Sequence, residues 1–413
     1  MPDLVIRNAR VATMGGVQAG KGEEPLGILE DSAVALEDGL ISWVGPDKGA
    51  PQGPVLDAQG GLLTPGFVEP HTHLLFGGER ADEHALRLAG ESYLSIGKRG
   101  LGILSTVRAT AAASDEALVQ GARARLERLV RAGVTTVEVK TGYGLSVAGE
   151  LRQLGLLAQA ARGANCEVVP TLLALHAAPP GIERAEWVKT AELELLPQVA
   201  RLGLARGCDA FCEQGAFTQA ECAQVLRAAG RLGLTLHLHA DQLTAGGGAE
   251  LAASLGCASA DHLERTSEAG RAALAQAGTV AVLLPLAAFF LREAQPAQAQ
   301  PFLAAGATVA LGGNLNPGSQ RIESVSLLLA AGCLLSGLTP AQALWACTAG
   351  GARALRLPDR GRIAPGLRAD LVLHATRDPA HLPYHAGVEH ALVVLREGQV
   401  VYDARSRRGE LGC

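Results

Sequence analysis

Eight short apolar runs recur through the middle of this 413-residue chain, and each has the composition of a β-strand. The runs are LLTPGFVEPHTH (62–73), VTTVEVKTG (134–142), CEVVPTLLALH (166–176), CDAFCEQG (208–215), LTLHLHAD (234–241), CASADHLE (257–264), TVAVLLP (279–285) and TVALGGNLN (308–316). Segments rich in Ala, Leu and Arg with a helical period, such as residues 115–133 and 220–233, lie between most of them. This alternation predicts an α/β fold built on a (β/α)8 TIM-like barrel. An open doubly wound sheet is the alternative, which the lack of G-x-G-x-x-G and G-K-[ST] motifs disfavours.

The two ends of the chain share a different pattern. Residues 3–14 and 32–45 near the start, and 369–375 and 390–404 near the end, alternate apolar and polar residues. Asp38-Gly39 and Glu397-Gly398 interrupt that alternation, which is typical of antiparallel hairpins with one solvated face. We therefore expect residues 1–60 and 360–413 to form one small β-sandwich domain, and residues 61–359 to form the barrel.

Bulk composition excludes several classes of partner. Net charge is −5 and aromatic residues make up 3% of the chain, so neither a basic footprint nor stacking platforms for nucleic acid are expected. No apolar run approaches roughly 18 residues, so we predict no membrane span. The eight cysteines contain no C-x-x-C pair, and the start of the chain does not resemble a signal peptide. These features favour a cytoplasmic protein with free thiols.

Histidines gather where the predicted strands end. In a parallel barrel these carboxyl ends form the active face. His71 and His73 end the first run two residues apart, so both imidazoles face the same side of an extended chain. In the fifth run, His239 lies nearer the end and is the better candidate ligand. We interpret His237 as a core histidine. In the sixth run, only one of two neighbouring residues should point inward, and we choose His262 over Asp261. Tyr143 and His176 follow the second and third runs.

Three neutral imidazoles suit Zn²⁺ or Fe²⁺ and leave a position for water. Such an ion lowers the pKa of its water toward ~7 and polarises a carbonyl. A nearby group must then carry the proton from water to the leaving nitrogen. The residues alone therefore predict metal-assisted hydrolysis.

Nine segments carry a more specific resemblance. They are PHTHLLFGGER (70–80), GILSTVRAT (102–110), GVTTVEVKTGYGL (133–145), FCEQGAF (211–217), HADQL (239–243), SADHLE (259–264), GTVAVLLP (278–285), NPGSQ (316–320) and LPYHAGVEH (382–390). Together they resemble the imidazolonepropionases, hydrolases of histidine degradation within the amidohydrolase superfamily. The match runs over nearly the whole chain.

The resemblance implies roles for individual residues. It implies His71, His73 and His239 as metal ligands, and opening of 4-imidazolone-5-propanoate by water to N-formimidoyl-L-glutamate. Proton transfer is expected to involve His262, Gln242 and residue 314. The implied substrate contacts are Arg80, Tyr143, His176, Gln242, Asn316, Gly318 and Ser319. A homodimer is also implied.

The residue chemistry fits a small substrate with a propionate tail. Arg80 offers a planar fork for the carboxylate, although a salt bridge with Glu79 or Asp82 is the alternative. Tyr143 and His176 can hydrogen-bond a ring nitrogen, and ordinary packing at the barrel mouth is the alternative for both. Gln242 can donate and accept, or it can be a solvated amide. We interpret Lys140 as structural or as a support behind the ligands, and not as a carbamylated metal bridge.

One position departs from the resemblance. Asn314 stands where the family has an aspartate, so its place among the metal ligands is open. An amide oxygen can still face a metal, but it cannot accept the proton, and losing a general base typically costs ~10²–10⁴ in rate. Three readings remain: an active enzyme in which His262 carries the proton, a weakened relative that binds ligand without turnover, and an Asn introduced by design or error.

Two rival functions stay open. One is hydrolysis of another ring, such as a hydantoin, a dihydropyrimidine or a guanine-like compound. The other is a non-catalytic protein that senses a histidine catabolite. The residues assign no role to His381, His385 and His390, which could brace the split domain against the barrel.

Overall fold

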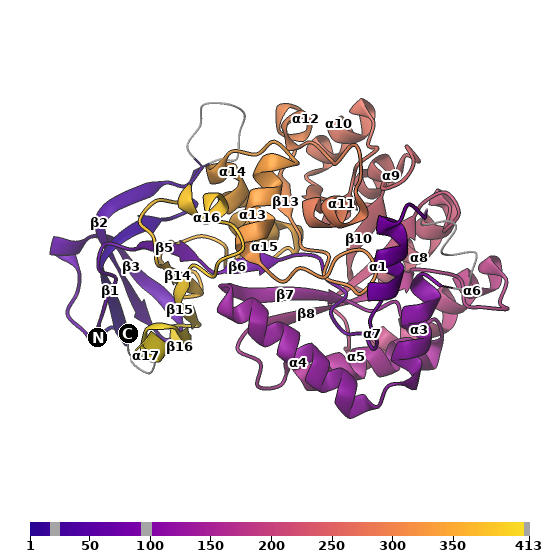
Figure 1. Ribbon diagram of the computed structural model, residues 1–413, viewed down its shortest axis with the longest axis horizontal. Helices are drawn as coiled ribbons and strands as arrows, with labels where there is room; N and C mark the ends of the chain where they lie inside the picture. Colours follow the sequence, from indigo (N-terminus) through magenta and orange to yellow (C-terminus); the bar gives the residue numbers. More distant parts are fainter. Residues whose placement is uncertain (17–24, 92–100, 409–413) are drawn as a thin grey trace.

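The computed structural model describes residues 1–16, 25–91 and 101–408. Figure 1 shows a barrel surrounded by helices, with a smaller sheet beside it at the left. These two sheets confirm the predicted fold class. The barrel strands are β6 (Phe67–Glu69), β7 (Val134–Lys140), β8 (Glu167–Leu175), β9 (Gly207–Cys212), β10 (Thr235–Ala240), β11 (Ser259–His262), β12 (Val280–Leu283) and β13 (Val309–Leu311).

Each of the eight predicted runs overlaps one of these strands, and neighbouring strands pair in parallel in chain order. The ring closes just beyond the ends of β6 and β13. Asn314 N donates to His71 O at 2.9 Å, and His73 N donates to Leu315 O at 2.9 Å. Closure therefore occurs at the carboxyl ends of the strands, next to the first two histidines.

Helices cover the outside of the barrel (Figure 1). They are α1 (Ala81–Leu88), α3 (Ile103–Ala112), α4 (Asp115–Arg131), α5 (Val147–Ala161), α6 (Arg184–Thr190), α7 (Leu196–Leu202), α8 (Gln219–Arg231), α9 (Gly248–Ser254), α10 (Glu268–Ala277), α11 (Pro285–Leu291), α12 (Ala299–Ala304), α13 (Val325–Leu334), α14 (Pro340–Trp345) and α15 (Gly351–Ala354). Both predicted helical segments are present as α4 and α8. A capping box starts α8, in which Thr218 and Glu221 each bind the other's backbone N–H. Among the described residues, no helix is long and apolar enough to cross a membrane.

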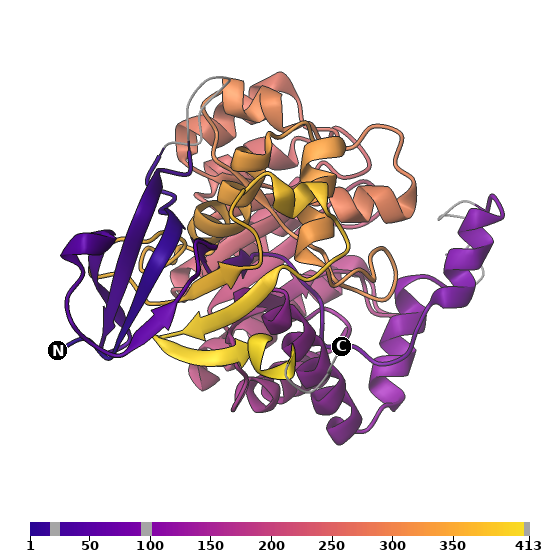
Figure 2. The same cartoon turned by 60° about the vertical axis from the view of Figure 1, so that its left-hand side comes forward.

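The smaller sheet joins both ends of the chain. Figure 2 shows its N-terminal strands in indigo next to its C-terminal strands in yellow. The hydrogen-bonded order is β16-β15-β14-β5-β1-β2-β3, with β4 paired to β1. The strands are β1 (Leu4–Ala12), β2 (Ile28–Glu37), β3 (Leu40–Pro46), β4 (Val55–Asp57), β5 (Leu62–Pro65), β14 (Leu371–His374), β15 (Ala391–Arg396) and β16 (Gln399–Asp403). Short helices α16 (His381–Tyr384) and α17 (Arg405–Arg408) flank the C-terminal strands.

The predicted turns of this sheet are present. The hairpin β2–β3 turns at Asp38-Gly39 and the hairpin β15–β16 turns at Glu397-Gly398. All four residues have positive φ, as a two-residue hairpin turn of type I′ requires.

One run is divided between the two sheets. Residues 62–73 were expected to start the barrel, but β5 pairs in the smaller sheet and only β6 belongs to the barrel. Pro65 has no N–H to continue a ladder, and a Cβ at Gly66 would lie 2.1 Å from Thr135 Oγ1. The chain can therefore change sheets at this dipeptide. The domain boundary at residue 60 remains a prediction.

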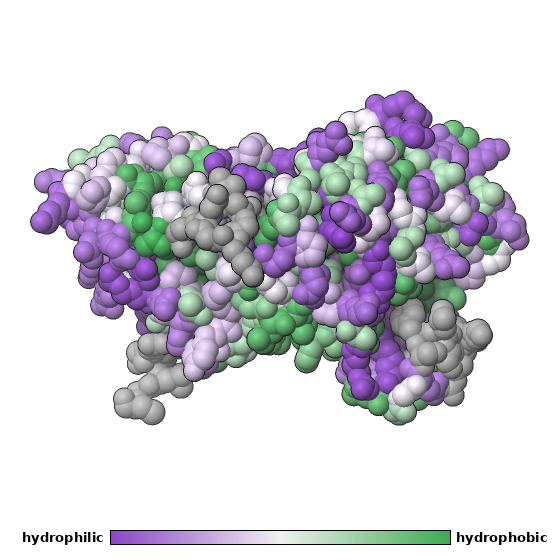
Figure 3. Space-filling view, turned by 90° about the horizontal axis from the view of Figure 1, so that it is seen from above, coloured by the Kyte–Doolittle hydropathy of each residue, from purple (hydrophilic) through white to green (hydrophobic). Residues whose placement is uncertain are grey.

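Apolar side chains from the strands and helices form one large core in the barrel and a separate one in the smaller sheet. Hydrophilic residues are spread over the face seen in Figure 3, with hydrophobic patches between them. The barrel interior also holds charged side chains, and these lie beneath the histidines described next.

Candidate metal centre and active site

Four histidines meet at the carboxyl ends of β6, β10 and β11. One donor nitrogen each from His71, His239 and His262 lies within 4.8 Å of the other two. The His73 ring lies beside them, with its centroid 5.3 Å from that of His71 and 5.5 Å from that of His239. The structure therefore brings together all four histidines that the sequence singled out. The division of labour between His73 and His262 as third ligand and proton carrier stays a prediction.

The imidazoles are set up to offer lone pairs. His71 Nδ1 lies 2.6 Å from Asp261 Oδ2, and because a carboxylate only accepts, the nitrogen must carry the proton. Within the described part of the chain, the buried His71 Nε2 has no hydrogen-bonding partner. Burial lowers the pKa values of His71 and His73 well below the usual range, so both rings are neutral. An unpaired buried nitrogen among neutral imidazoles fits a divalent cation.

The structure corrects the expectation that only one of Asp261 and His262 points inward. Asp261 contacts His71 while His262 belongs to the histidine group, and both side chains are buried. His262 ends β11 with φ +82°, and Leu263 has φ +71°. The backbone leaves the extended conformation there, so the alternation of a strand no longer applies.

A buried charge network lies behind the histidines. Lys140 Nζ is 3.0 Å from Glu138 Oε1, 2.8 Å from Asp209 Oδ2 and 3.4 Å from Asp261 Oδ2. All four side chains have no solvent exposure. Burial alone would lower the pKa of Lys140, but the surrounding carboxylates outweigh burial and raise it. Lys140 is therefore a fixed cation, in keeping with a structural or supporting role.

The carboxylate of Asp209 connects this network to a second histidine. Asp209 Oδ2 is 3.0 Å from His239 Nδ1. Burial alone would raise the pKa of Asp209, whereas His239 and Lys140 hold it well below its usual range. Asp241, in contrast, accepts from the backbone N–H groups of Gly248 and Ala249 at 2.8 and 3.1 Å and so caps α9.

Arg80 lies buried at the start of α1. Its Nε donates to Glu83 Oε2 at 2.8 Å, because Glu83 lies one helical turn further along α1 and faces the same side. The partner is therefore neither Glu79 nor Asp82. Glu79 instead pairs with Arg321. The guanidinium also packs against Gly318, where an added Cβ would lie 2.1 Å from Nη1. Arg80 is therefore held between α1 and the turn of residues 316–319.

Tyr143 and His176 line the same region. Their ring centroids lie 5.6 Å apart, and the His176 ring stacks on His73 at 5.4 Å. His176 Nδ1 donates to Gly142 O at 2.9 Å, which leaves Nε2 as an acceptor. Burial lowers the pKa of His176 to about 4. Gln242 is half-buried just beyond β10.

The two asparagines after β13 have different environments. Asn314 has φ +56° and is buried beside His71, whose carbonyl accepts from its backbone N–H. Asn316 organises the following turn: Nδ2 donates to Asn314 O at 2.7 Å and to Ser319 Oγ at 2.8 Å, and Oδ1 accepts from Gly318 N and Ser319 N at 2.8 Å each. The second amide thus shapes the turn that packs on Arg80.

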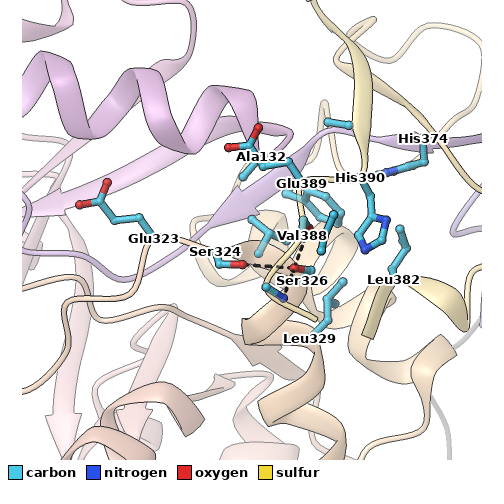
Figure 4. A pocket seen from close by; sticks show the side chains of 14 residues that line it. Ala132, Glu323, Ser324, Ser326, Leu329, His374, Leu382, Val388, Glu389 and His390 are labelled. Atoms are coloured by element: carbon cyan, nitrogen blue, oxygen red, sulfur yellow. Dashed lines mark hydrogen bonds between the residues drawn. The ribbon is translucent and has the colours of Figure 1, made fainter. Parts of the chain in front are cut away.

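His381, His385 and His390 lie away from this centre, at the seam between barrel and smaller sheet. Their ring centroids are 5.5, 5.8 and 5.6 Å apart. Ser326 Oγ on α13 donates to Val388 O and accepts from Gly387 N, beside a hollow of about 130 Å³ (Figure 4). None of the four histidines of the metal centre lines this hollow. The contacts favour a bracing role for the segment.

Sequence reasoning missed the contacts that Glu138, Asp209, Asp261 and Glu83 make beside the predicted site residues. A signal existed for the first three, since a charged residue within an apolar strand is costly unless it is paired. What the sequence could not show is which distant segment supplies the partner.

Similar proteins share this architecture over nearly the full chain. A sequence profile of the amidohydrolase family matches residues 334–402. An imidazolonepropionase of Anaeromyxobacter dehalogenans (strain 2CP-1) is 52% identical, covering 98% of this chain and 97% of the relative. An imidazolonepropionase of Myxococcus xanthus is 47% identical, covering 96% of this chain and 97% of the relative.

The fold also matches solved structures. An adenosine deaminase of Xanthomonas campestris with bound zinc superposes with a TM-score of 0.73 at 22% identity, covering 98% of this chain and 94% of the other. At that identity the likeness concerns the fold alone. The sequence identities to full-length relatives are the finding that decides the family: this chain belongs to the imidazolonepropionases of the amidohydrolase superfamily.

Proposed function

We propose that this chain hydrolyses 4-imidazolone-5-propanoate to N-formimidoyl-L-glutamate with one divalent cation, Zn²⁺ or Fe²⁺, at the histidine cluster. The observation that carries the proposal is the convergence of His71, His239 and His262 within 4.8 Å, in a member of this family. The reaction adds one water: the ring carbonyl carbon gains the oxygen, its bond to nitrogen breaks, and that nitrogen gains a proton.

The histidines would hold the cation, which supplies Lewis acidity for the attacking water and the ring carbonyl. His71 and His239 are ligands in this proposal, and His73 is the third. His262 carries the proton toward the leaving nitrogen. Bound zinc in the structurally similar deaminase supports this use of the fold.

The remaining residues would hold the substrate. Arg80 binds the propionate through the donors that Glu83 leaves free, and the turn of Asn316, Gly318 and Ser319 keeps the guanidinium in place. Tyr143, His176 and Gln242 hydrogen-bond the ring. Because His176 Nδ1 donates to Gly142 O, its Nε2 can accept a hydrogen bond from a ring N–H.

The test of the activity is turnover by the purified, metal-loaded chain, followed as loss of the ultraviolet absorbance of the imidazolone. Arg80→Ala should raise KM for imidazolone propionate at least tenfold and change KM for an uncharged cyclic amide far less. Equal effects on both substrates would favour hydrolysis of a different ring.

The two histidine roles are separable by substitution. His73→Ala should lose metal, whereas His262→Ala should keep metal and lose turnover. If His262→Ala lost metal and His73→Ala kept it, the two roles would be exchanged. The short distances from the His262 donor atom to those of His71 and His239 would agree with that result.

Asn314 favours a second candidate, a relative that binds the ligand with little turnover. Its neutral side-chain amide, whose Oδ1 accepts from Asn316 Nδ2 at 3.1 Å, cannot accept a proton from water. Bound metal and retained imidazolone without loss of absorbance would support that candidate.

A homodimer and a cytoplasmic location are also part of this proposal. The seven cysteines among the described residues are all free thiols, which fits a reducing compartment. Light scattering on the purified chain tests the dimer.

A further inference from the structure

The buried ammonium of Lys140 reaches toward two metal-site histidines through two carboxylates. Asp261 Oδ2 contacts both Lys140 Nζ, at 3.4 Å, and His71 Nδ1, at 2.6 Å. Asp209 Oδ2 contacts both Lys140 Nζ, at 2.8 Å, and His239 Nδ1, at 3.0 Å. Each carboxylate oxygen therefore lies between one cation and one imidazole.

The groups of this network come from separate strands. Lys140 ends β7, Asp209 lies in β9, His239 in β10 and Asp261 in β11. Glu138 lies two residues before Lys140, so it faces the same interior and adds a third carboxylate, at 3.0 Å. Lys140 thus touches every carboxylate of the cluster.

The carboxylates face the outer nitrogens of both histidines, through a hydrogen bond at His71 and an ion-pair contact at His239. A carboxylate facing Nδ1 fixes the proton there and turns the Nε2 lone pair toward the metal. Two carboxylates this close would repel each other in the barrel interior without a cation between them. At least one would turn away and leave its imidazole free to rotate.

We propose that Lys140 is a positioning residue for the metal centre, which holds Asp209 and Asp261 so that His71 and His239 present their Nε2 atoms to one cation. The inference rests on the proposed metal site. It also excludes a carbamylated Lys140, because three carboxylates around Nζ require a cation there and not a carbamate.

The test compares Lys140→Met with Arg360→Met. Arg360 is a buried cation that contacts β7 near the end opposite to Lys140. Its Nη1 donates to Thr136 Oγ1 and Glu167 Oε2 at 2.9 Å each. Zinc affinity is measured by competition with a chelator, and the visible spectrum of the Co²⁺-loaded protein reports the ligand geometry. Loss of an outer partner of a metal ligand typically weakens metal affinity 10–100-fold.

We expect Lys140→Met to bind zinc at least tenfold more weakly and to alter the Co²⁺ spectrum. Arg360→Met should lose stability yet bind zinc with an affinity within about twofold of the original chain. Unchanged zinc affinity in Lys140→Met, or an equal loss in Arg360→Met, overturns the proposal.

A second pair of variants decides the matter where Lys140→Met does not fold. Asp209→Asn and Asp261→Asn each neutralise one carboxylate that Lys140 holds, and each should weaken zinc binding at least tenfold. Full affinity in both contradicts the inference. If the original chain binds no divalent metal, the proposed function itself fails, which is a separate result.

Discussion

The guanidinium of Arg80 has little freedom, because Glu83 holds it on one side and Gly318 packs against the other. A glycine is required at residue 318 for this close approach. Of these two neighbours, Gly318 is also an implied substrate contact, whereas Glu83 is not. Substrate affinity therefore also depends on residues that fix where the Arg80 side chain lies.

Gly318→Ala should consequently raise KM. The added Cβ would lie 2.1 Å from Arg80 Nη1, so the guanidinium must shift away from the propionate. We expect KM for imidazolone propionate to rise at least tenfold while kcat changes less than threefold, as measured by steady-state kinetics. Gly155→Ala is the control, since nothing lies within 4 Å of a Cβ there in helix α5. An unchanged KM would separate the turn from substrate binding.

Asn314 gives the second prediction for a single residue. An aspartate there restores a proton acceptor beside His71, so Asn314→Asp should raise kcat at least tenfold at saturating metal. Asn316→Asp makes the same change two residues further on. There it replaces the amide that donates to Asn314 O and Ser319 Oγ, and it should lower kcat/KM. A kcat of Asn314→Asp no higher than that of the original chain would remove the proton-acceptor role from this position.

Among the secondary-structure elements, local signals were sufficient for the strands. The apolar runs are short and bounded by Gly, Pro or polar residues, so each of the eight overlaps one barrel strand. The switch of sheets at Pro65-Gly66 was not predictable from the run itself. It depends on Thr135, which approaches from a strand about 70 residues away in sequence.

The same limit applies to the site. The histidines were predicted because they stand at the ends of apolar strands, with His71 and His73 together after β6. The pairing of Lys140 with Asp209 and Asp261 was not, because the partners are separated by dozens of residues and only the closed barrel brings them together. Likewise, no residue pattern predicts the positive φ of His262. That φ lets both Asp261 and His262 face the site.

A prediction about stability concerns Ser326 on helix α13. Ser326 Oγ makes two hydrogen bonds to the segment between α16 and β15, at 2.9 Å to Val388 O and 3.0 Å from Gly387 N. Ser326→Ala should lower the free energy of unfolding by about 1 kcal/mol, because water can replace part of the lost bonding at the exposed partners. Urea denaturation measures the change. Ser254→Ala, which removes a bond within α9 only, is the control, and a wild-type midpoint for Ser326→Ala would deny the bracing role.

For the whole molecule, the buried His374 links stability to pH. Thr64 Oγ1 donates to Pro65 O, so the 2.9 Å contact is donated by His374 Nε2 and leaves Nδ1 without a proton. Burial lowers the pKa of His374 to about 3, against about 6.5 in an unfolded chain. Between these values the unfolded state binds more protons, so stability falls as the pH drops below 6.5.

His374→Gln should reduce this acid sensitivity, since Gln can still donate to Thr64 and does not titrate. Between pH 7.5 and 5.5, the loss in unfolding free energy should shrink by about 1.4 kcal/mol relative to the original chain. Urea titrations with a chelator present measure it without a contribution from metal release. His385→Gln, at an exposed position of the same seam, is the control. An identical pH dependence in His374→Gln would contradict the buried neutral state.

The claim on which the activity depends is that imidazoles from separate strands of the barrel share one cation. Metal stoichiometry is its most direct measurement, determined by elemental analysis after equilibration with Zn²⁺ and removal of loosely bound ions. The account predicts one zinc per chain in the original protein and well under 0.1 in the double variant His71→Ala, His239→Ala. Retention of a full equivalent by that double variant, or none by the original chain, would contradict it.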